Sequence, residues 1–175
     1  MNARTLISFE EFEQYPDDDM RHELIDGDHV IRPPANIRES LIRHELHDSL
    51  NVHVTSHGIG RCYIAAGFLL SQQSWLQPDV SVVRAAQVQA ADPDYYYRGA
   101  PAIAVEIAAE SLLAEHLELK MNLYFEHGSE EVWVVYPQTR RVRVHTADGM
   151  SRTVASGELT SAALTWLVDR GRLAI

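Results

Sequence analysis

A strongly apolar segment with one acidic residue at its centre constrains the fold of this chain more than any other feature. The segment AIAVEIA (residues 102–108) has the β-branched and small residues of a buried strand. Because side chains alternate along a strand, Ile103, Val105 and Ile107 share one face, and Glu106 lies among alanines on the other. Burying a lone carboxylate is costly, so we expect Glu106 to have a cationic or metal partner. The simpler alternative places Glu106 in water, at the edge of a closely packed helix.

The next segment repeats this anomaly with the opposite charge. LLAEHLELKMNLYFEHG (112–128) is predicted to be a helix that ends at its glycine. One face of this helix carries a stripe formed by Leu113, Leu117, Met121 and Tyr124. Lys120 falls within that stripe, where a lysine either extends to solvent or binds an anion. Glu106, on the preceding strand, is the anion that we expect.

Two more carboxylates are candidates for the same site. Asp79 follows a proline directly before VSVVR (80–84), a run that is typical of a buried strand. Most Pro-Asp pairs in such places are simple turn residues, so a functional role for Asp79 depends on its partners. Glu23 lies on the first arm of a predicted hairpin, HELIDGDHVIR (22–32). A glutamate in a hairpin is a weak signal by itself.

These residue types suit metal-assisted hydrolysis of a phosphodiester. Carboxylate oxygens are the ligands that Mg²⁺ and Mn²⁺ prefer. Such an ion activates a water molecule and offsets the charge that grows on the phosphate. A lysine stabilises the same charge electrostatically.

The order of these segments resembles the PD-(D/E)XK nuclease superfamily. It is more closely similar to the Uma-type family of proteins classed as restriction endonucleases. The resemblance runs from about residue 8 to 137, and in outline to 145, and it rests on RHELIDGDHV, QPDVSVV, GAPAIAVEI and ELKMNLYFEHGSEEVWVVYP. It implies an α/β (α+β), restriction-endonuclease-like fold, with a central mixed β-sheet flanked by helices.

The resemblance also assigns roles to the candidate residues. It implies that Asp79 and Glu106 are metal ligands, that Glu23 is an additional acid of the site, and that Lys120 is the site's lysine. In the superfamily pattern the lysine stands two residues after the second acid, where this chain has Ala108. Other departures from similar proteins are Ala109 and Glu110 in place of a serine-proline pair, and Glu39 in place of a histidine.

Composition limits the other possibilities. We expect one domain over residues 1–175, and no apolar run approaches the roughly 18–20 residues that span a bilayer. The polar start and the single cysteine, Cys62, are consistent with a cytoplasmic protein. The formal net charge of −10 counts against binding of nucleic acid, which requires local positive charge.

The best basic patch in the sequence is a set of arginines on one predicted strand, RRVRVH (140–145). Arg140, Arg141 and Arg143 are the candidates for contacts with a nucleic-acid backbone, and DNA is the nucleic acid that we expect. An exposed sheet face that balances an acidic protein is an equally good explanation. Cleavage of both strands of a duplex would favour a homodimer.

The remaining segments predict further elements. Helices are expected at SFEEFEQY (8–15), which opens with a capping box, and over 36–57. Strands are expected at GRCYIAAGFLLS (60–71), EEVWVVYP (130–137) and RRVRVHTA (140–147). Residues 85–100 are predicted to be irregular, and the tail after residue 157 is predicted to form a short helical turn.

Two other functions compete with the nuclease. A non-catalytic binding or assembly module could keep the carboxylates and the lysine as a buried salt bridge. A transition-metal protein could use the pairs His53 and His57, or His44 and His47, on the first long helix. Without a third ligand, a solvated helix surface is the better explanation of these histidines.

Overall fold

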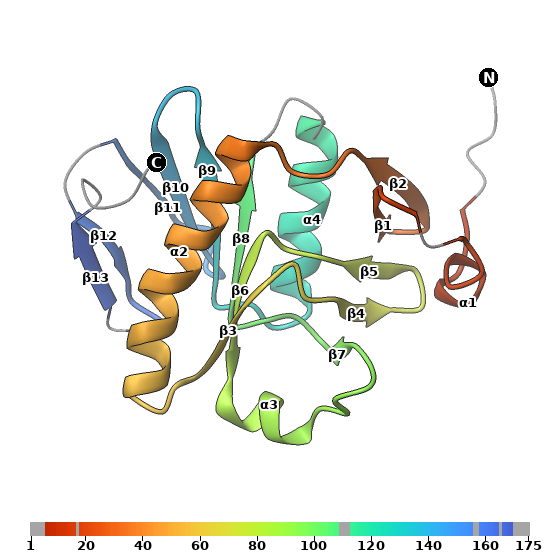
Figure 1. Cartoon of the computed structure of the whole chain (residues 1–175), viewed down its shortest axis with the longest axis horizontal. Helices are drawn as coiled ribbons and strands as arrows, with labels where there is room; N and C mark the ends of the chain where they lie inside the picture. Colours follow the sequence, from red (N-terminus) through yellow and green to blue (C-terminus); the bar gives the residue numbers. More distant parts are fainter. Residues whose placement is uncertain (1–5, 17, 109–112, 156–157, 165, 170–175) are drawn as a thin grey trace.

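Helices cover two mixed sheets in this α+β structure (Figure 1). The computed structural model describes residues 6–16, 18–108, 113–155, 158–164 and 166–169. Within these residues, one sheet has the order β2-β1-β5-β4-β7 and is built from β1 (Arg21–Ile25), β2 (Asp28–Arg32), β4 (Phe68–Ser71), β5 (Ser74–Leu76) and β7 (Tyr97–Arg98).

The second sheet forms the centre of the molecule. Its order is β11-β10-β9-β8-β6-β3, and its strands are β3 (Gly60–Ile64), β6 (Val80–Arg84), β8 (Ile103–Ile107), β9 (Glu131–Tyr136), β10 (Arg141–Thr146) and β11 (Ser151–Val154). Strand β8 runs parallel to β9 and antiparallel to β6. The predicted central mixed sheet with flanking helices is therefore confirmed.

The described helices are α1 (Phe9–Phe12), α2 (Ile37–Ser56), α3 (Ala85–Ala90) and α4 (Ala114–Glu126). The predicted capping box of α1 is present, since Ser8 and Glu11 bond each other's backbone N–H groups. Helix α2 opens with a second capping box, formed by Asn36 and Glu39. None of the described helices is long and apolar enough to cross a membrane.

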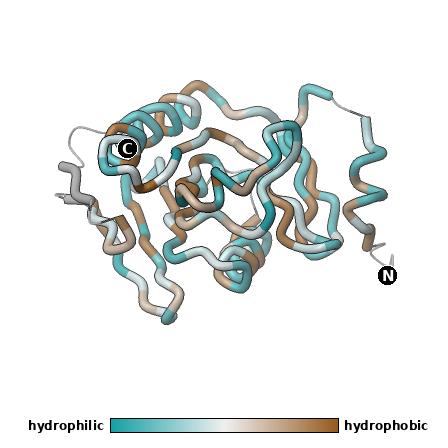
Figure 2. The backbone as a smooth tube through the Cα atoms, turned by 90° about the horizontal axis from the view of Figure 1, so that it is seen from below, coloured by the Kyte–Doolittle hydropathy of each residue, from teal (hydrophilic) through white to brown (hydrophobic). Residues whose placement is uncertain are grey.

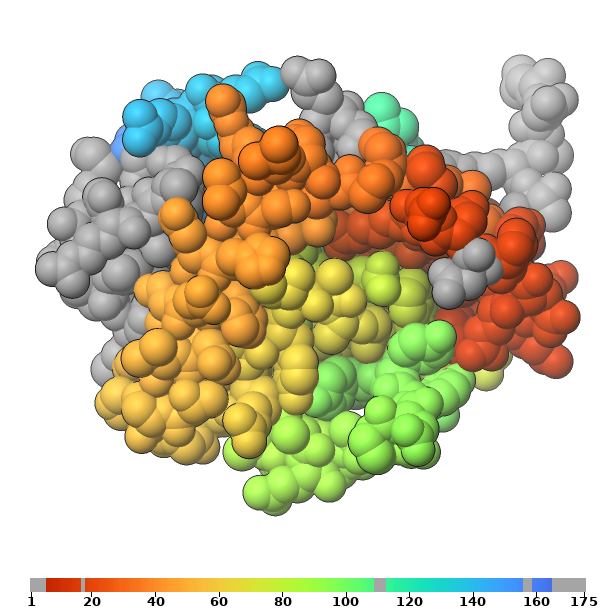
Figure 3. Space-filling view, viewed as in Figure 1, coloured from red at the N-terminus to blue at the C-terminus, as the bar shows by residue number. Residues whose placement is uncertain are grey.

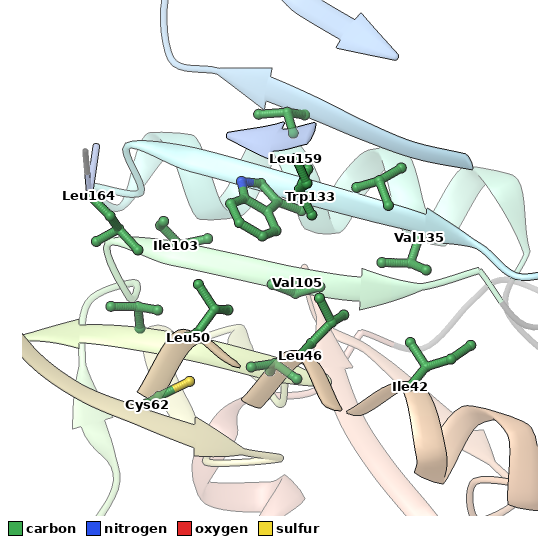
Figure 4. Close-up of a cluster of buried hydrophobic side chains, with 14 of the residues drawn as sticks. Ile42, Leu46, Leu50, Cys62, Ile103, Val105, Trp133, Val135, Leu159 and Leu164 are labelled. Atoms are coloured by element: carbon green, nitrogen blue, oxygen red, sulfur yellow. The ribbon is translucent and has the colours of Figure 1, made fainter. Parts of the chain in front are cut away.

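Helix α2 packs on one face of the six-stranded sheet. Hydrophobic and hydrophilic stretches alternate along the backbone of the molecule (Figure 2). In α2 the buried residues Ile42, Leu46, Leu50 and Val54 recur every four positions, which places them on one side of the helix. Ile42, Leu46 and Leu50 lie against Val105 and Trp133 in the main hydrophobic core (Figure 4). Full burial of such a side chain stabilises the fold by about 1.5–3 kcal/mol relative to its exposure.

Helix α4 covers the opposite face of the same sheet. Its Tyr124 packs in a second core with Ala104 and Val132, which are on neighbouring strands. Leu113 is the N-cap of α4 and is exposed, so its predicted place in the buried stripe is wrong. Lys120 and Tyr124 are the members of the helix that are fully buried.

The segment GRCYIAAGFLLS does not form one strand as predicted. It forms β3 in one sheet and β4 in the other, and Cys62 of β3 lies in the main core. The chain turns at Ala65, which has a positive φ of 51°, and passes close to the aromatic rings at Gly67. A Cβ at Gly67 would lie 2.7 Å from a ring carbon of Trp75, so the crossing between the sheets requires glycine here.

Two other predictions of local structure are wrong. Residues 85–100, predicted to be irregular, contain the short helix α3 and the two-residue strand β7. The tail does not form a helical turn, because β12 (Glu158–Ser161) pairs with β13 (Trp166–Asp169). Leu159 and Leu164 are buried in the main core, which provides the tertiary contacts that local sequence does not reveal.

Candidate active site

The charge on β8 is fully buried, as the sequence predicts. Ile103, Val105 and Ile107 face the main core, and Glu106 points to the side of α4. The exposed fraction of Glu106 is 0%, so the alternative of a solvated glutamate at the sheet edge is wrong. The side chain must therefore be stabilised by partners inside the protein.

Lys120 supplies that partner from α4. Its Nζ lies 2.7 Å from Oε1 of Glu106 and 2.8 Å from Oε1 of Glu23, and the lysine is fully buried. Tyr124, one turn further along α4, donates a hydrogen bond of 2.7 Å to the same oxygen of Glu106. The other oxygen, Glu106 Oε2, is buried and has no hydrogen-bond partner among the described residues.

Asp79 directly precedes β6, and both of its oxygens have partners. Oδ2 accepts a hydrogen bond of 2.6 Å from the backbone N–H of Ile107. Oδ1 accepts from Arg21 at 2.5 Å and also from Arg43. The aspartate is therefore much more than a turn residue, because it joins β6, β8, β1 and α2.

Glu23 belongs to the same region and binds three groups. It pairs with Lys120, it accepts a hydrogen bond of 2.7 Å from Arg32, and Oε1 accepts one of 2.8 Å from the backbone N–H of Gln77. The structure thus brings together all four of the predicted residues. We refer to the full set as the charged cluster: Arg21, Glu23, Arg32, Arg43, Asp79, Glu106 and Lys120.

The three arginines of the cluster were not predicted from the sequence. Two of them could have been found, because Arg21 shares its strand face with Glu23 and the two-residue turn of the hairpin sets Arg21 opposite Arg32. Arg43 gives no such signal, since it stands next to Ile42 on α2 and only the tertiary fold directs it toward Asp79. With these arginines the cluster contains four cationic side chains and three carboxylates.

The surroundings shift the pKa values of the carboxylates in opposite directions. Burial alone would raise the pKa of Glu23, but the charges of Lys120, Arg21 and Arg32 outweigh it and lower this pKa to about 2. Burial opposes ionisation of Asp79 as well, but Arg21 and Arg43 hold its pKa well below the usual range.

Glu106 behaves differently. Burial raises its pKa, and the nearby charges of Asp79 and Glu23 add to this effect, while Lys120 opposes it. The hydroxyl of Tyr124 also has a strongly raised pKa, through burial and the charge of Glu106, so it remains a hydrogen-bond donor. Glu106 is therefore the carboxylate whose ionised form the fold supports least.

The cluster fits a divalent cation better at Glu106 than at Asp79. The free, buried Oε2 of Glu106 is an oxygen of the type that Mg²⁺ and Mn²⁺ bind. An ion at Asp79 would compete with Arg21 and Arg43 for Oδ1. No group of three or more His, Cys, Asp or Glu side chains in the described part of the chain is arranged to hold a metal ion.

The other predicted site residues lie away from these contacts. Arg141 and Arg143 are exposed on β10, and Arg143 bonds Thr153 of the next strand. Arg140 precedes that strand and has a positive φ of 54°. Ala109 and Glu110, which differ from the family pattern, lie outside the described residues.

The helix histidines make local contacts. His53 bonds the carbonyl of Leu164, and His57 bonds the carbonyl of His53. His44 bonds the carbonyl of Ser40, and His47 contacts Asp48 and the carbonyl of Cys62. Each of the four rings thus has a hydrogen-bond partner in the protein.

Comparisons with known proteins agree with this fold. The family model described as "Uma2: Putative restriction endonuclease" matches residues 9–169. A crystal structure from Anabaena variabilis ATCC 29413, described as "a putative nuclease belonging to DUF820", is similar with a TM-score of 0.84 and 17% identity, over 96% of this chain and 97% of that chain. A search of curated proteins gives no match. Because the family model spans nearly the whole sequence, the chain belongs to the Uma2 family and has a restriction-endonuclease-like fold.

Proposed function

We propose that this protein is a Mg²⁺- or Mn²⁺-dependent nuclease that hydrolyses phosphodiester bonds, with DNA as its expected substrate. One observation carries the proposal: Asp79, Glu106 and Lys120 come from three separate elements and meet in one buried cluster. Membership of the Uma2 family and the nuclease-like fold support it. A purely structural core would bury apolar residues at these positions at lower cost.

Glu106 would hold the metal ion through its free Oε2, and Asp79 would share the ion in place of an arginine contact at Oδ1. When bound, the ion supplies an activated water and offsets charge on the phosphate. Tyr124 and Lys120 both contact Glu106 Oε1, which leaves Oε2 open. The backbone N–H of Ile107 fixes the second oxygen of Asp79.

Lys120 would stabilise the charge that develops on the phosphate. Its ammonium group lies between Glu106 and Glu23, which hold it in place without solvent. Glu23 acts as a positioning residue in this proposal, since Lys120, Arg32 and the backbone of Gln77 use its oxygens.

Register across the central sheet supports a path for the nucleic-acid backbone. Glu106 pairs with Val134, and Val134 pairs with Arg143, so Glu106 and Arg143 lie on the same sheet face. Two strand spacings separate them by roughly 10 Å. Arg143, with Arg140 and Arg141, would contact phosphates beside the cluster. A homodimer would place two such sites on one duplex.

A second candidate is a binding or assembly module in which the cluster is only structural. The saturation of Asp79 by Arg21, Arg43 and the N–H of Ile107 favours it. The two candidates differ in what joint replacement of Glu106 by Leu and Lys120 by Met does. A structural cluster would tolerate the loss of the whole ion pair or become more stable, whereas a nuclease would lose its activity.

Cleavage of supercoiled plasmid DNA and of RNA, with Mg²⁺, Mn²⁺ or EDTA, tests the proposal. The wild type should cleave only with a metal ion, and Asp79→Ala, Glu106→Gln and Lys120→Met should each abolish cleavage. Asp79→Asn serves where the alanine variant does not fold. Glu118→Gln, on the exposed side of α4, is the matched control. Full activity of folded Glu106→Gln would refute the assignment.

A further inference from the structure

Two guanidinium groups converge on one carboxylate oxygen from separate elements. Arg21 comes from β1 and Arg43 from α2, and both donate to Oδ1 of Asp79. Each uses one of its nitrogens for this contact. A guanidinium group has five N–H donors in a planar fork, so most of the donors of the pair remain for other acceptors.

Several of those remaining donors are buried and unpartnered. Nε and Nη2 of Arg21 and Nε of Arg43 have no hydrogen-bond partner within the described residues. The Arg21 side chain is only 10% exposed and that of Arg43 only 14%, so bulk water supplies few acceptors. Buried donors are normally satisfied, and an unsatisfied set in one place indicates a missing acceptor.

The charge of the cluster points to an anionic acceptor. With all groups ionised, four cationic side chains face three carboxylates, which leaves an excess of one positive charge. This local excess contrasts with the formal net charge of −10 of the whole chain.

The segments that carry the two arginines lie next to each other at the surface. The space-filling view shows α2 and the N-terminal segment side by side on one face (Figure 3). Arg43 and Arg21 belong to these two segments. Each side chain keeps a small exposed fraction, through which a ligand can reach the pair.

We propose that Arg21 and Arg43 form a phosphate-binding site beside Asp79, which takes a phosphodiester group of nucleic acid. The inference rests on the proposed nuclease function for the identity of the ligand. The planar forks of arginine match phosphate oxygens in pairs, which a lysine does not. The two arginines thus provide the local positive charge that binding of nucleic acid requires and that the acidic composition of the chain does not predict.

Binding of a fluorescein-labelled duplex DNA in EDTA, measured by anisotropy at several salt concentrations, tests the site. Arg43→Gln should weaken binding about tenfold, as expected for a lost charge-assisted contact, and Arg21→Gln should act in the same direction. Arg43→Lys should remain weak although it keeps the charge. Arg38→Gln removes the same charge from an exposed position of α2 and should change affinity less than about twofold.

Inorganic phosphate should compete with the DNA for the wild type and much less for Arg43→Gln. Equal DNA affinity of the wild type and Arg43→Gln would overturn the site, as would a wild type that does not bind DNA at low salt. Circular dichroism verifies the folding of each variant, and Arg43→Lys replaces Arg43→Gln where the latter unfolds.

The same proteins separate this inference from the proposed function. Arginine-dependent binding without cleavage in Mn²⁺ would leave the phosphate site standing and refute the nuclease. Metal-dependent cleavage, together with DNA binding that is unchanged by substitution of Arg21 or Arg43, would support the nuclease and refute the phosphate site.

Discussion

The side of the central sheet that faces α2 is packed with aliphatic side chains, whereas the side that faces α4 holds an ammonium group against carboxylates. Val105 and Glu106 are neighbours on β8, and the exposed fraction of each is 0%. Leu46 of α2 lies over the first face, and Lys120 of α4 lies over the second. Two neighbouring residues of one strand are thus equally buried, one by aliphatic packing and the other by ion pairing.

The two sides should therefore respond differently to substitution. On the α2 side each group contributes through its buried area, and the loss of one leaves the others in contact. On the α4 side each charge depends on its partner, so the loss of one leaves another buried and uncompensated. Such a cluster costs stability that an apolar core would not, which is typical of a functional site.

The largest expected effect is that of Asp79→Ala on stability. The change leaves Arg21 and Arg43 without their shared carboxylate, and loss of one partner of a buried ion pair costs about 3–5 kcal/mol. Urea denaturation followed by circular dichroism measures the loss. Asp94→Ala, at an exposed position, should change the free energy of unfolding by less than about 0.5 kcal/mol. A loss of under 1 kcal/mol at Asp79 would contradict the ion-pair description.

Leu46→Ala should cost about 2–5 kcal/mol through the cavity that it creates on the α2 side. Because the charged cluster is untouched, cleavage per folded molecule should equal that of the wild type. Denaturation and plasmid cleavage on the same preparation measure both quantities. A variant that folds but loses Mn²⁺-dependent cleavage would show that the two sides are not separable.

The stability of Glu106→Gln, measured against pH, tests whether Glu106 differs from the other two carboxylates of the cluster in the direction of its pKa shift. Because folding raises the pKa of Glu106 above its ordinary value of 4.5, its ionisation destabilises the folded state as the pH rises. The glutamine variant keeps an acceptor for Tyr124 and has no such penalty, so its stability relative to the wild type should increase as the pH rises above 4.5. An equal difference at all pH values would contradict the raised pKa.

Ionisation of the other two carboxylates, Glu23 and Asp79, should stabilise the fold, so acid should destabilise it through them. The pKa of Glu23 is lowered to about 2 and that of Asp79 is lowered as well, so both stabilise the fold above the pKa of the unfolded chain. This stability is lost as the pH falls from about 4.5 toward 2. Acid titrations of the wild type and Glu106→Gln should therefore end in the same loss of structure.

The smallest expected effect is that of Arg143→Gln on DNA binding. An exposed arginine that contacts one phosphate contributes a slope of about one to the dependence of log affinity on log salt. Anisotropy in EDTA should show a shallower slope and a slightly weaker affinity. An unchanged slope would remove β10 from the proposed backbone path.

The sequence reveals which residues belong together better than it reveals how they are connected. Glu106 and Lys120 are predictable as partners, because each breaks an apolar pattern on consecutive elements. The fold joins Asp79 and Glu23 to them, as the family resemblance implies. Arg43 is not predictable, since it contacts Asp79 across a sequence separation of 36 residues.

The wrong predictions of secondary structure also arise from contacts between residues that are distant in sequence. The segment around Ala65 and Gly67 looks like a continuous strand, because the ring of Trp75 that forces the crossing is distant in sequence. The C-terminal strands depend on burial of Leu159 against the main core. Local propensity does not contain these tertiary contacts.

Calorimetric titration of Mn²⁺ into the wild type and Glu106→Gln tests the central claim most directly, since it requires no knowledge of the substrate. Glu106→Gln is the variant of choice, because Glu23 still pairs with Lys120 in it and Tyr124 keeps an acceptor, so the fold should be retained. The account predicts that the wild type binds Mn²⁺ and that the glutamine variant does not. Equal binding by both proteins, or binding by neither, would contradict a metal-dependent site at Glu106 and favour a structural charged cluster.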